Sequence, residues 1–264
     1  MKQITSRDNP AFKRLRALSE DARARREAAA TLLDGAHLLT VALDHGCELP
    51  CVVVTPDSRS KPEIAVLLAR PELARAQLLE MPAALLRALS PVEHPSGVVA
   101  ELRIPAAPIA DTGDVLVLAG VQDTGNLGTL LRTAAAAGIR RAWLSAECTQ
   151  AWSPKALRAG MGAQFFMDIE ERVALAERLA GFSGQIIATA LSEKTVPLYA
   201  LDLRPDTAWI FGSEGQGVPP ALQAQAQILT GIPMPGGMES LNVAAAAAVC
   251  LFEQVRQRRL HNGA

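Results

Sequence analysis

The stretch VLVLAGVQDTGNLGTLLRTAAAAG, residues 115–138, shows how the second half of the chain is built. Residues 115–121 form an apolar run of strand length, and the helical pattern that follows stops at Gly138, a residue suited to ending helices. Strand-like and helix-like segments then alternate as far as a final helix that starts at Asn242. This alternation predicts an α/β fold whose mostly parallel sheet is covered by helices on both faces.

The N-terminal part of the chain contains a second and smaller set of elements. Phe12, Leu15 and Leu18 follow helical spacing, and the run CVVV lies between two prolines, as a strand would. The segment PAAPIADTGD then has prolines and glycine without periodicity, which is typical of a linker. The sequence therefore predicts a small α/β domain over residues 1–103, a linker over 104–113 and a larger α/β domain over 114–264.

Charge is distributed unevenly along the chain. The 264 residues carry a net charge of −1, but residues 1–26 contain eight Lys/Arg against three Asp/Glu, so this end is +5 and the remainder is −6. A basic end on an otherwise acidic chain favours contact with a polyanion. A solvated N-terminal helix without a partner would explain the same charge.

Several classes of protein are disfavoured by the sequence. The N-terminus lacks an apolar signal region and no apolar run is long enough to cross a bilayer, so we expect a cytoplasmic protein without a membrane span. Four cysteines in a chain of this length do not form a disulfide framework. His45, Cys47 and Cys51 are close together, but their spacing fits no common zinc site, and we expect no metal.

Three predicted strands end in unusual polar residues. Asn126 and Arg132 follow the first strand, Ser213 and Glu214 lie among glycines after WIFG, and the loop IPMPGGMESLN leads into the last helix. Ligands of parallel α/β domains bind at the carboxyl ends of the strands, so these residues are candidates for a functional site. Each segment also has a plain structural explanation, because Asn, Asp and Ser cap helices and glycine-rich turns are common.

Other chemistries find less support. Neither a G-x-G-x-x-G pattern nor a P-loop is present, which disfavours a Rossmann enzyme that acts on small molecules. The four histidines lie away from the three strand ends, and no Ser–His–Asp order or metal-ligand spacing occurs. A hydrolase or a metalloenzyme is therefore poorly supported.

The three polar segments resemble a known set of motifs. VQDTGNLGTLLRTAAAAG, IFGSEGQGV and IPMPGGMESLNVAAAAAVCLFE are similar, in order and spacing, to the three motifs of the SpoU (TrmH-like) family of RNA ribose methyltransferases in the SPOUT superfamily. SPKALRAGMGA resembles the family's segment between the first two motifs, and ITSRDNPAFKRLRAL resembles its N-terminal substrate-binding domain. Two residues depart from the family pattern, Thr124 in place of Pro and Ser213 in place of Asn.

The resemblance implies a fold and an activity. It implies a C-terminal trefoil-knot domain with a parallel sheet and a small, L30e-like N-terminal α/β domain that binds RNA. It further implies S-adenosylmethionine as methyl donor, a ribose 2′-hydroxyl as acceptor, and an active site at a homodimer interface. Knots are nearly absent from proteins in general, so only the resemblance supports the knot.

The motif positions assign roles to individual residues. Arg132, the arginine of the first motif, is the family's candidate for activating the ribose hydroxyl, and we interpret it as an electrostatic group because a guanidinium keeps its proton. The expected catalytic residues are Arg132, Asn126, Glu214, Ser240 and Asn242. The expected cofactor-binding residues are Gly212, Ile232, Leu241, Met234, Phe211, Thr189, Ala190 and Leu191. The expected RNA-binding residues are Lys2, Arg7, Lys13, Arg14, Arg16, Lys155 and Arg158.

The identity of the substrate stays open at this stage. A whole N-terminal domain of RNA-binding type favours ribosomal RNA over transfer RNA. A transfer RNA 2′-O-methyltransferase, a base methyltransferase of the same superfamily and a non-catalytic RNA-binding relative are the alternatives. The joint presence of the five expected catalytic residues argues against the non-catalytic relative; they are Asn126, Arg132, Glu214, Ser240 and Asn242.

Overall fold

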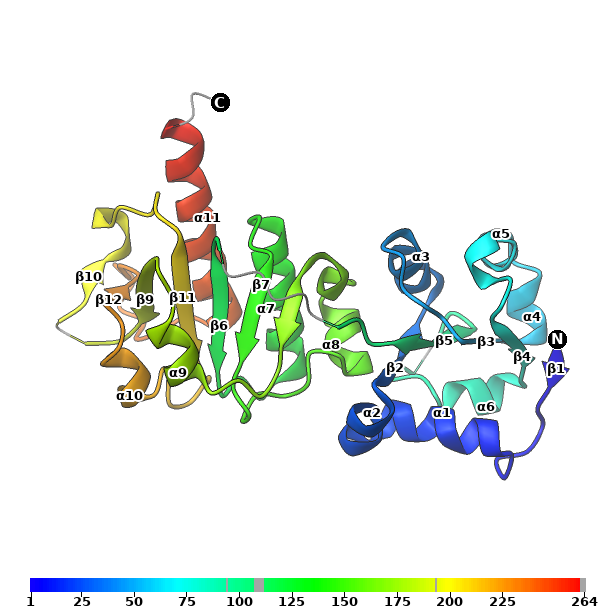
Figure 1. Cartoon of the computed structure of the whole chain (residues 1–264). Coiled ribbons are helices and arrows are strands. Elements are labelled where there is room, and N and C mark those ends of the chain that lie inside the picture. Colours follow the sequence, from blue (N-terminus) through cyan, green and yellow to red (C-terminus); the bar gives the residue numbers. More distant parts are fainter. Residues whose placement is uncertain (94, 107–111, 193, 262–264) are drawn as a thin grey trace. The chain divides into compact units, whose positions relative to one another are not determined.

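The structure is a computed structural model that describes residues 1–93, 95–106, 112–192 and 194–261 (Figure 1). The chain forms two compact units. The first consists of Met1–Ala106 and Trp152–Phe165, and the second of Ala107–Ala151 and Phe166–Ala264. Residues 107–111 of the predicted linker lie outside the described residues.

The first unit contains a five-stranded mixed sheet in the order β1-β4-β3-β5-β2. β5 is antiparallel to both of its neighbours, and the other pairs are parallel. The strands are β1 (Lys2–Gln3), β2 (Ala30–Asp34), β3 (Cys51–Val54), β4 (Gln77–Glu80) and β5 (Val98–Arg103). The helices are α1 (Pro10–Glu20), α2 (Ala22–Ala28), α3 (Ala36–Asp44), α4 (Pro56–Arg59), α5 (Pro62–Leu68), the 3-10 turn η1 (Pro71–Leu73), α6 (Ala83–Arg87) and α8 (Pro154–Ala159).

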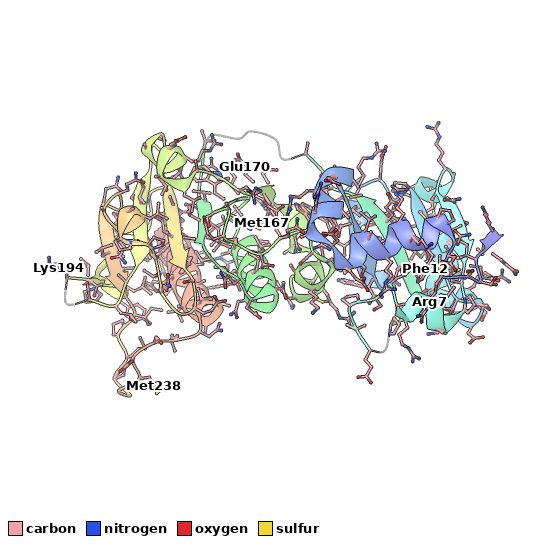
Figure 2. The ribbon with its side chains drawn as sticks, turned by 90° about the horizontal axis from the view of Figure 1, so that it is seen from below. Arg7, Phe12, Met167, Glu170, Lys194 and Met238 are labelled. Atoms are coloured by element: carbon pink, nitrogen blue, oxygen red, sulfur yellow. The ribbon has the colours of Figure 1, made fainter. Side chains whose placement is uncertain are left out.

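Helix α1 buries the apolar stripe that the sequence predicts. Asn9 caps the helix by accepting a hydrogen bond from the Ala11 N–H at 2.9 Å. Phe12 (Figure 2), Leu15 and Leu18 are at most 2% exposed and pack in one core cluster with residues of β2, β3, β4 and β5. Burial of side chains of this size stabilises the fold by about 1.5–3 kcal/mol each, which fixes α1 on the sheet.

Residues 152–165 fall within the predicted C-terminal domain but pack in the first unit. Thr31 of β2 donates its hydroxyl hydrogen to the Trp152 carbonyl at 2.6 Å, across 121 positions of sequence. Leu157 of α8 is fully buried, and the rings of Trp152 and Phe165 lie 6.1 Å apart. α8 buries its apolar face against β2, and no local pattern in the sequence signals such a long-range contact.

The second unit contains a seven-stranded sheet in the order β10-β12-β9-β11-β6-β7-β8. The strands are β6 (Val115–Ala119), β7 (Arg141–Leu144), β8 (Asp168–Glu170), β9 (Gln185–Thr189), β10 (Val196–Pro197), β11 (Thr207–Gly212) and β12 (Ile228–Gly231). The helices are α7 (Thr124–Ala136), α9 (Leu175–Ala180), α10 (Pro220–Gln223) and α11 (Val243–His261), with the 3-10 turns η2 (Ala163–Phe166), which spans the unit boundary, and η3 (Leu198–Ala200). β10 and η3 are not among the elements that the sequence predicts.

Every neighbouring strand pair in this sheet is parallel, which confirms the predicted α/β fold. α9 and α10 cover one face, and α7 and α11 cover the other (Figure 1). β6 and β11 at the centre are buried along their whole length, so they have continuous apolar runs rather than alternating ones. The carboxyl ends of β6, β9, β11 and β12 consequently lie along one edge of the sheet.

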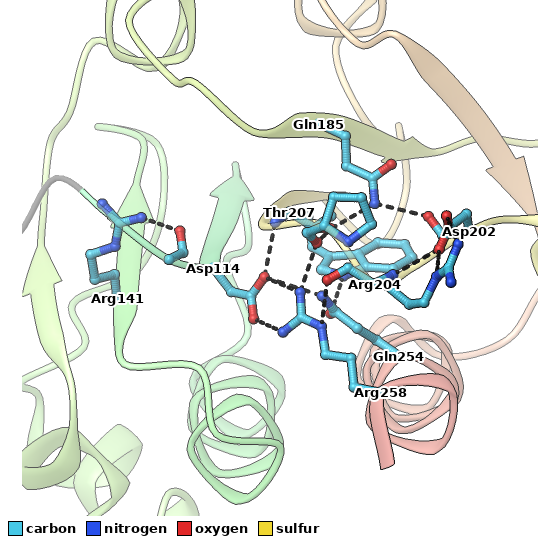
Figure 3. Close-up of polar contacts among 11 residues, drawn as sticks. Asp114, Arg141, Gln185, Asp202, Arg204, Thr207, Gln254 and Arg258 are labelled. Carbon is cyan, nitrogen blue, oxygen red and sulfur yellow. Dashed lines mark hydrogen bonds and ion pairs between the residues drawn. The ribbon is translucent and has the colours of Figure 1, made fainter. Parts of the chain in front are cut away.

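Asp114 ties the last helix to the opposite, amino-terminal edge (Figure 3). Its Oδ1 accepts hydrogen bonds from the Thr207 N–H at 2.8 Å and from Gln254 Nε2 at 3.1 Å. Arg258 of α11 donates to both carboxylate oxygens, at 2.5 and 2.9 Å, and also to the Arg204 carbonyl at 3.1 Å. The network holds α11 in register with β6 and β11, and α11 begins at the candidate site.

We expect Arg258→Ala to lower the free energy of unfolding by about 2–3 kcal/mol, because it leaves a mostly buried carboxylate without its charge partner. The Asp114 side chain is only 13% exposed in this pair. Urea denaturation measures the loss, and Arg259→Ala, at the exposed neighbouring position, serves as the control. Equal stability of the two variants would show that the network contributes nothing.

Candidate active site

The polar segments predicted from the sequence meet at the carboxyl edge of the parallel sheet. Asp123 follows β6 and caps α7 by accepting the Asn126 N–H at 2.7 Å. β11 ends at Gly212 and continues into a tight turn, and β12 continues into the loop that leads to α11. Figure 2 shows Met238 at the outer end of this loop. The site is therefore assembled from three segments that are distant in sequence.

Three of the expected catalytic residues form one hydrogen-bonded chain. Asn126 Nδ2 donates to Glu214 Oε1 at 2.8 Å, and Asn242 Nδ2 donates to Asn126 Oδ1 at 3.0 Å. Asn242 Oδ1 accepts the N–H groups of Ala244 and Ala245, at 2.9 and 3.3 Å. Asn242 is thus both the cap of α11 and a hydrogen-bond partner of Asn126, and its catalytic role stays a prediction.

Arg132 takes no part in the hydrogen bonds among Glu214, Asn126 and Asn242. It follows Asn126 by six positions on α7, which turns its side chain about 120° away around the helix axis. Its side chain is exposed, and among the residues that the structure describes no carboxylate or carbonyl holds the guanidinium. Ser240, likewise exposed, has no side-chain hydrogen bond within the described ranges.

The turn after β11 depends on the absence of a side chain at Gly212. A Cβ built there would come within 1.9 Å of the Gly217 carbonyl carbon. Ser213 and Gly217 bridge each other through N–H···O bonds of 3.2 and 2.9 Å. The Ser213 hydroxyl accepts the Gln216 N–H at 3.2 Å, so the departure from the family's Asn is accommodated inside the turn. This turn places Glu214 beside Asn126.

The expected cofactor residues are distributed over the ends of β9, β11 and β12. Thr189 pairs with Thr230, and a Cβ at Gly231 would approach Thr195 Oγ1 to 3.2 Å, so the segments after β9 and β12 run close together. Phe211 is fully buried and its ring stacks on that of Trp209 at 6.0 Å, so only its backbone faces this edge. The exposed apolar residues are Leu191, Met238 and Leu241, whereas Ile232, Met234 and Ala190 are half-buried.

Four of the seven expected RNA-binding residues are already in ion pairs within the first unit. The pairs are Lys13 with Asp8, Arg14 with Glu101, Arg16 with Glu20 and Arg158 with Asp34. Lys2, Arg7 and Lys155 are exposed and have no ion pair among the described residues. These three cations are the ones free to meet an outside anion.

The cysteines and acidic groups form no other centre in the described part of the chain. All four cysteines are free thiols, and no group of three or more His, Cys, Asp or Glu side chains is placed to hold a metal ion there. Burial raises the pKa of Cys51 and of Cys250 to about 12, so these thiols stay protonated at neutral pH. None of the described helices is both long and apolar enough to span a membrane.

Residues 114–252 match the SpoU rRNA Methylase family, and residues 9–100 match the MRM3-like substrate binding domain. This chain belongs to the SpoU rRNA methylase family. The resemblance read from the three motifs is thereby confirmed. The MRM3-like match covers most of the first unit, and the SpoU match covers both the parallel sheet and the α8 segment.

Some relatives match this SpoU chain over nearly its whole length and others over about half of it. An uncharacterized tRNA/rRNA methyltransferase of Synechocystis is 35% identical over 97% of this chain and 94% of its own. The 23S rRNA (guanosine(2553)-2′-O)-methyltransferase RlmP of Bacillus subtilis is 29% identical over 96% of this chain and 98% of its own. The 23S rRNA (guanosine-2′-O-)-methyltransferase RlmB of Xylella fastidiosa is 40% identical, over 55% of this chain and 59% of its own.

Solved structures agree with the SpoU assignment. An AdoMet-bound rRNA methyltransferase from Sinorhizobium meliloti superposes with a TM-score of 0.84 at 29% identity and covers 98% of each chain. An RNA 2′-O ribose methyltransferase superposes with a TM-score of 0.81 at 30% identity, over 97% of this chain and 99% of its own.

The sequence did not reveal that the backbone at Gly231 runs close to Thr195 in this SpoU protein. That an Asp of the first segment caps a helix is confirmed, and the bond that Asp123 accepts sets the start of α7 and hence the position of Asn126. The spacing of an Asp three positions before Asn126 was the available signal. Gly231 carries no such signal, because its closeness to Thr195 is purely tertiary.

Proposed function

We propose that this SpoU protein is an enzyme that transfers a methyl group from S-adenosylmethionine to a ribose 2′-hydroxyl of ribosomal RNA. The observation that carries the proposal is the hydrogen-bonded chain of Glu214, Asn126 and Asn242, which joins one residue from each motif. The names of the relatives RlmB and RlmP, and the bound AdoMet in a solved relative, support the same substrate class and donor.

The carboxyl edge of the sheet fits this cofactor chemically. S-Adenosylmethionine carries a sulfonium cation, and the loop GIPMPGGMESLN contains no Lys or Arg to repel it. Cβ atoms at Gly236 and Gly237 would meet nothing within 4 Å, so the backbone there is open to a ligand. Leu191 and Leu241 offer exposed apolar surface for the adenosyl group. The bound cofactor supplies an activated methyl group.

We assign the cofactor contacts to the strand ends. Gly212, Ile232 and Leu241 would hold it chiefly through their backbones, while Met234 and the stretch 189–191 (Thr189, Ala190, Leu191) would wall the adenine. Phe211 would contribute only its backbone, since its ring is buried.

The residues of this chain then act on the ribose. The hydroxyl is a poor nucleophile at neutral pH, and negative charge develops on its oxygen during attack. Arg132 stabilises that charge, because its guanidinium stays positive and has no partner of its own among the described residues. Asn126, Glu214, Ser240 and Asn242 orient the ribose at the edge of the site.

The assembly and the domains complete the proposal. Phe252 and Leu260 on α11 are 48% and 67% exposed, apolar surface that a second copy of the chain would cover. We propose a homodimer with the site completed at its interface, a trefoil knot in residues 114–264, and RNA binding by residues 1–103. Light scattering of the purified protein measures the mass, and a monomer would contradict the assembly. We further propose that the protein acts in the cytoplasm.

The proposal is tested by mapping 2′-O-methyl groups. Ribosomal and transfer RNA from cells with and without this protein are compared for resistance to alkaline cleavage, which a 2′-O-methyl group confers. We expect one ribosomal position to lose its resistance and purified protein with labelled cofactor to restore it. Restoration only in transfer RNA would select the alternative substrate, and no transfer to either RNA would refute the enzyme.

We expect the double variant Lys2→Ala/Arg7→Ala to bind ribosomal RNA more weakly and with a smaller salt dependence. Loss of two phosphate contacts reduces the slope of log affinity against log salt by roughly 1.5. Filter binding between low and moderate salt measures this slope. The control is Arg70→Ala, whose guanidinium is paired with Asp44 and Glu72 and should leave the slope unchanged. An unaltered slope in the double variant would show that Lys2 and Arg7 face solvent and do not contact RNA phosphates.

A further inference from the structure

The hydrogen bonds around Asn126 have a direction that the side chains cannot reverse. The backbone N–H groups of Ala244 and Ala245 can only donate, so the amide group of Asn242 must turn its oxygen toward them. Its Nδ2 is then left to donate to Asn126 Oδ1. Asn126 must in turn direct its own Nδ2 toward Glu214.

Glu214, at the other end of this series of hydrogen bonds, fixes the same donor-to-acceptor direction. An ionised carboxylate can only accept hydrogen bonds, and Glu214 Oε1 accepts from Asn126 at 2.8 Å. Both ends therefore agree, and neither Asn can flip without placing two donors or two acceptors face to face. The hydrogen bonds thus run in one direction, from the first N–H groups of α11 through two side-chain amides to the carboxylate.

Glu214 is left with one oxygen available to a substrate. Its side chain is exposed, and no donor in the described part of the chain reaches Oε2. Arg132 cannot accept a proton, because a guanidinium is already protonated at neutral pH. The motif segments bring two other carboxylates to this edge, but Asp123 caps α7 and Glu239 has no hydrogen bond to another motif residue within the described ranges. Glu214 is thus the carboxylate that Asn126 holds in place and that keeps a free acceptor oxygen.

We propose that Glu214 accepts the proton of the ribose 2′-hydroxyl through Oε2, and that Asn126 and Asn242 are the positioning residues that hold it as an acceptor. This inference rests on the proposed methyl transfer. The ribose O2′ forms a bond to the methyl carbon while the carbon–sulfur bond breaks and its electron pair remains on sulfur, which loses its positive charge. The hydroxyl proton passes to Glu214, which later releases it to water.

Asn242→Asp separates positioning from capping. Aspartate still accepts the Ala244 and Ala245 N–H groups and is a good helix cap, so α11 should start normally. It has no donor for Asn126 Oδ1, which frees Asn126 to flip and release Glu214. We expect the single-turnover rate to fall about 100-fold, with the affinity for S-adenosylmethionine, the half-saturating RNA concentration and the melting temperature nearly unchanged.

The matched control is the same substitution at another helix cap. Asn9 caps α1 by accepting the Ala11 N–H, and Asn9→Asp should leave the single-turnover rate at saturating RNA unchanged. Glu214→Gln removes the proton acceptor at constant size and should lower the rate by about 100- to 10,000-fold. Glu214→Asp, which restores a carboxylate, should recover part of this loss.

The assay follows full-length protein in one turnover with labelled S-adenosylmethionine and ribosomal RNA from cells that lack the protein. A wild-type rate in Glu214→Gln would overturn the assignment of the proton. An Asn242→Asp variant with an unchanged rate, or one that loses cofactor affinity and stability along with the rate, would overturn the positioning role. Absence of transfer by the wild-type protein would refute the proposed function itself, so the two failures are distinguishable.

Discussion

Arg132→Ala is expected to lower the rate of methyl transfer at least about 1,000-fold while changing the affinity for S-adenosylmethionine less than threefold. The expected loss is large because the guanidinium would stabilise an oxygen on which charge appears only during the reaction. The affinity should persist because Arg132 projects from α7, whereas the proposed cofactor contacts lie on β9, β11 and the loop after β12.

The structure predicts that this substitution leaves the fold intact. The Arg132 side chain is exposed and has no hydrogen bond or ion pair among the described residues, so its removal breaks no internal contact. Single-turnover kinetics and calorimetric titration with the cofactor measure the two effects. Thr129→Ala, at an exposed position of the same helix, is the matched control and should retain the wild-type rate. A parallel loss of rate, cofactor affinity and melting temperature would make Arg132 a structural residue.

Gly212→Ala is expected to destabilise the protein by more than about 4 kcal/mol, or to prevent folding of the second unit, because the new methyl group has no space. Its Cβ would lie 1.9 Å from the Gly217 carbon, 2.0 Å from the Gly217 oxygen and 2.1 Å from the Val218 nitrogen. These are backbone atoms of a turn that cannot move aside singly. Thermal unfolding and the yield of folded protein measure the effect.

The same turn provides the control. A Cβ at Gly215 would meet nothing within 4 Å, so Gly215→Ala should fold with a melting temperature close to that of the wild type. Gly184→Ala shows the effect of a similar clash far from the candidate site. Its Cβ would lie 2.2 Å from the Asp206 carbonyl oxygen, at the amino-terminal edge of the sheet. Normal stability of Gly212→Ala would mean that the turn opens readily and does not position Glu214.

The sequence predicted those elements whose local patterns are strong and missed those whose patterns are weak. The parallel sheet was predictable because β6 and β11 are buried on both faces and therefore appear as unbroken apolar runs. β4 was missed because QLLE is short and half-exposed, without the β-branched residues typical of strands. The predicted boundary at the linker did not anticipate that Trp152 packs with β2, since that contact joins residues 121 positions apart.

The candidate site likewise has features that the sequence predicts and features that it does not. The three motifs were sufficient to select Asn126, Glu214 and Asn242, because glycines, caps and polar residues at strand ends leave a linear signature. The direction of their hydrogen bonds was not predictable. It arises from the start of α11, which fixes the orientation of Asn242, and from the clash-free turn at Gly212, which brings Glu214 to Asn126.

The sequence by itself determined the α/β fold, the family of the chain and the residue types gathered at the edge of its parallel sheet. The fold follows from local periodicity, and the family is recognised from motifs that are defined by residue order and spacing. Only the tertiary structure decided which cations of the first unit are free, since Arg14 of α1 is held by Glu101 of β5 while Lys2 has no ion pair with any described residue. It also decided that Glu214 is held as an acceptor while Arg132 has no partner in the part of the chain that the structure describes. Hydrogen-bond direction and ion pairing depend on distances between segments that come together only on folding.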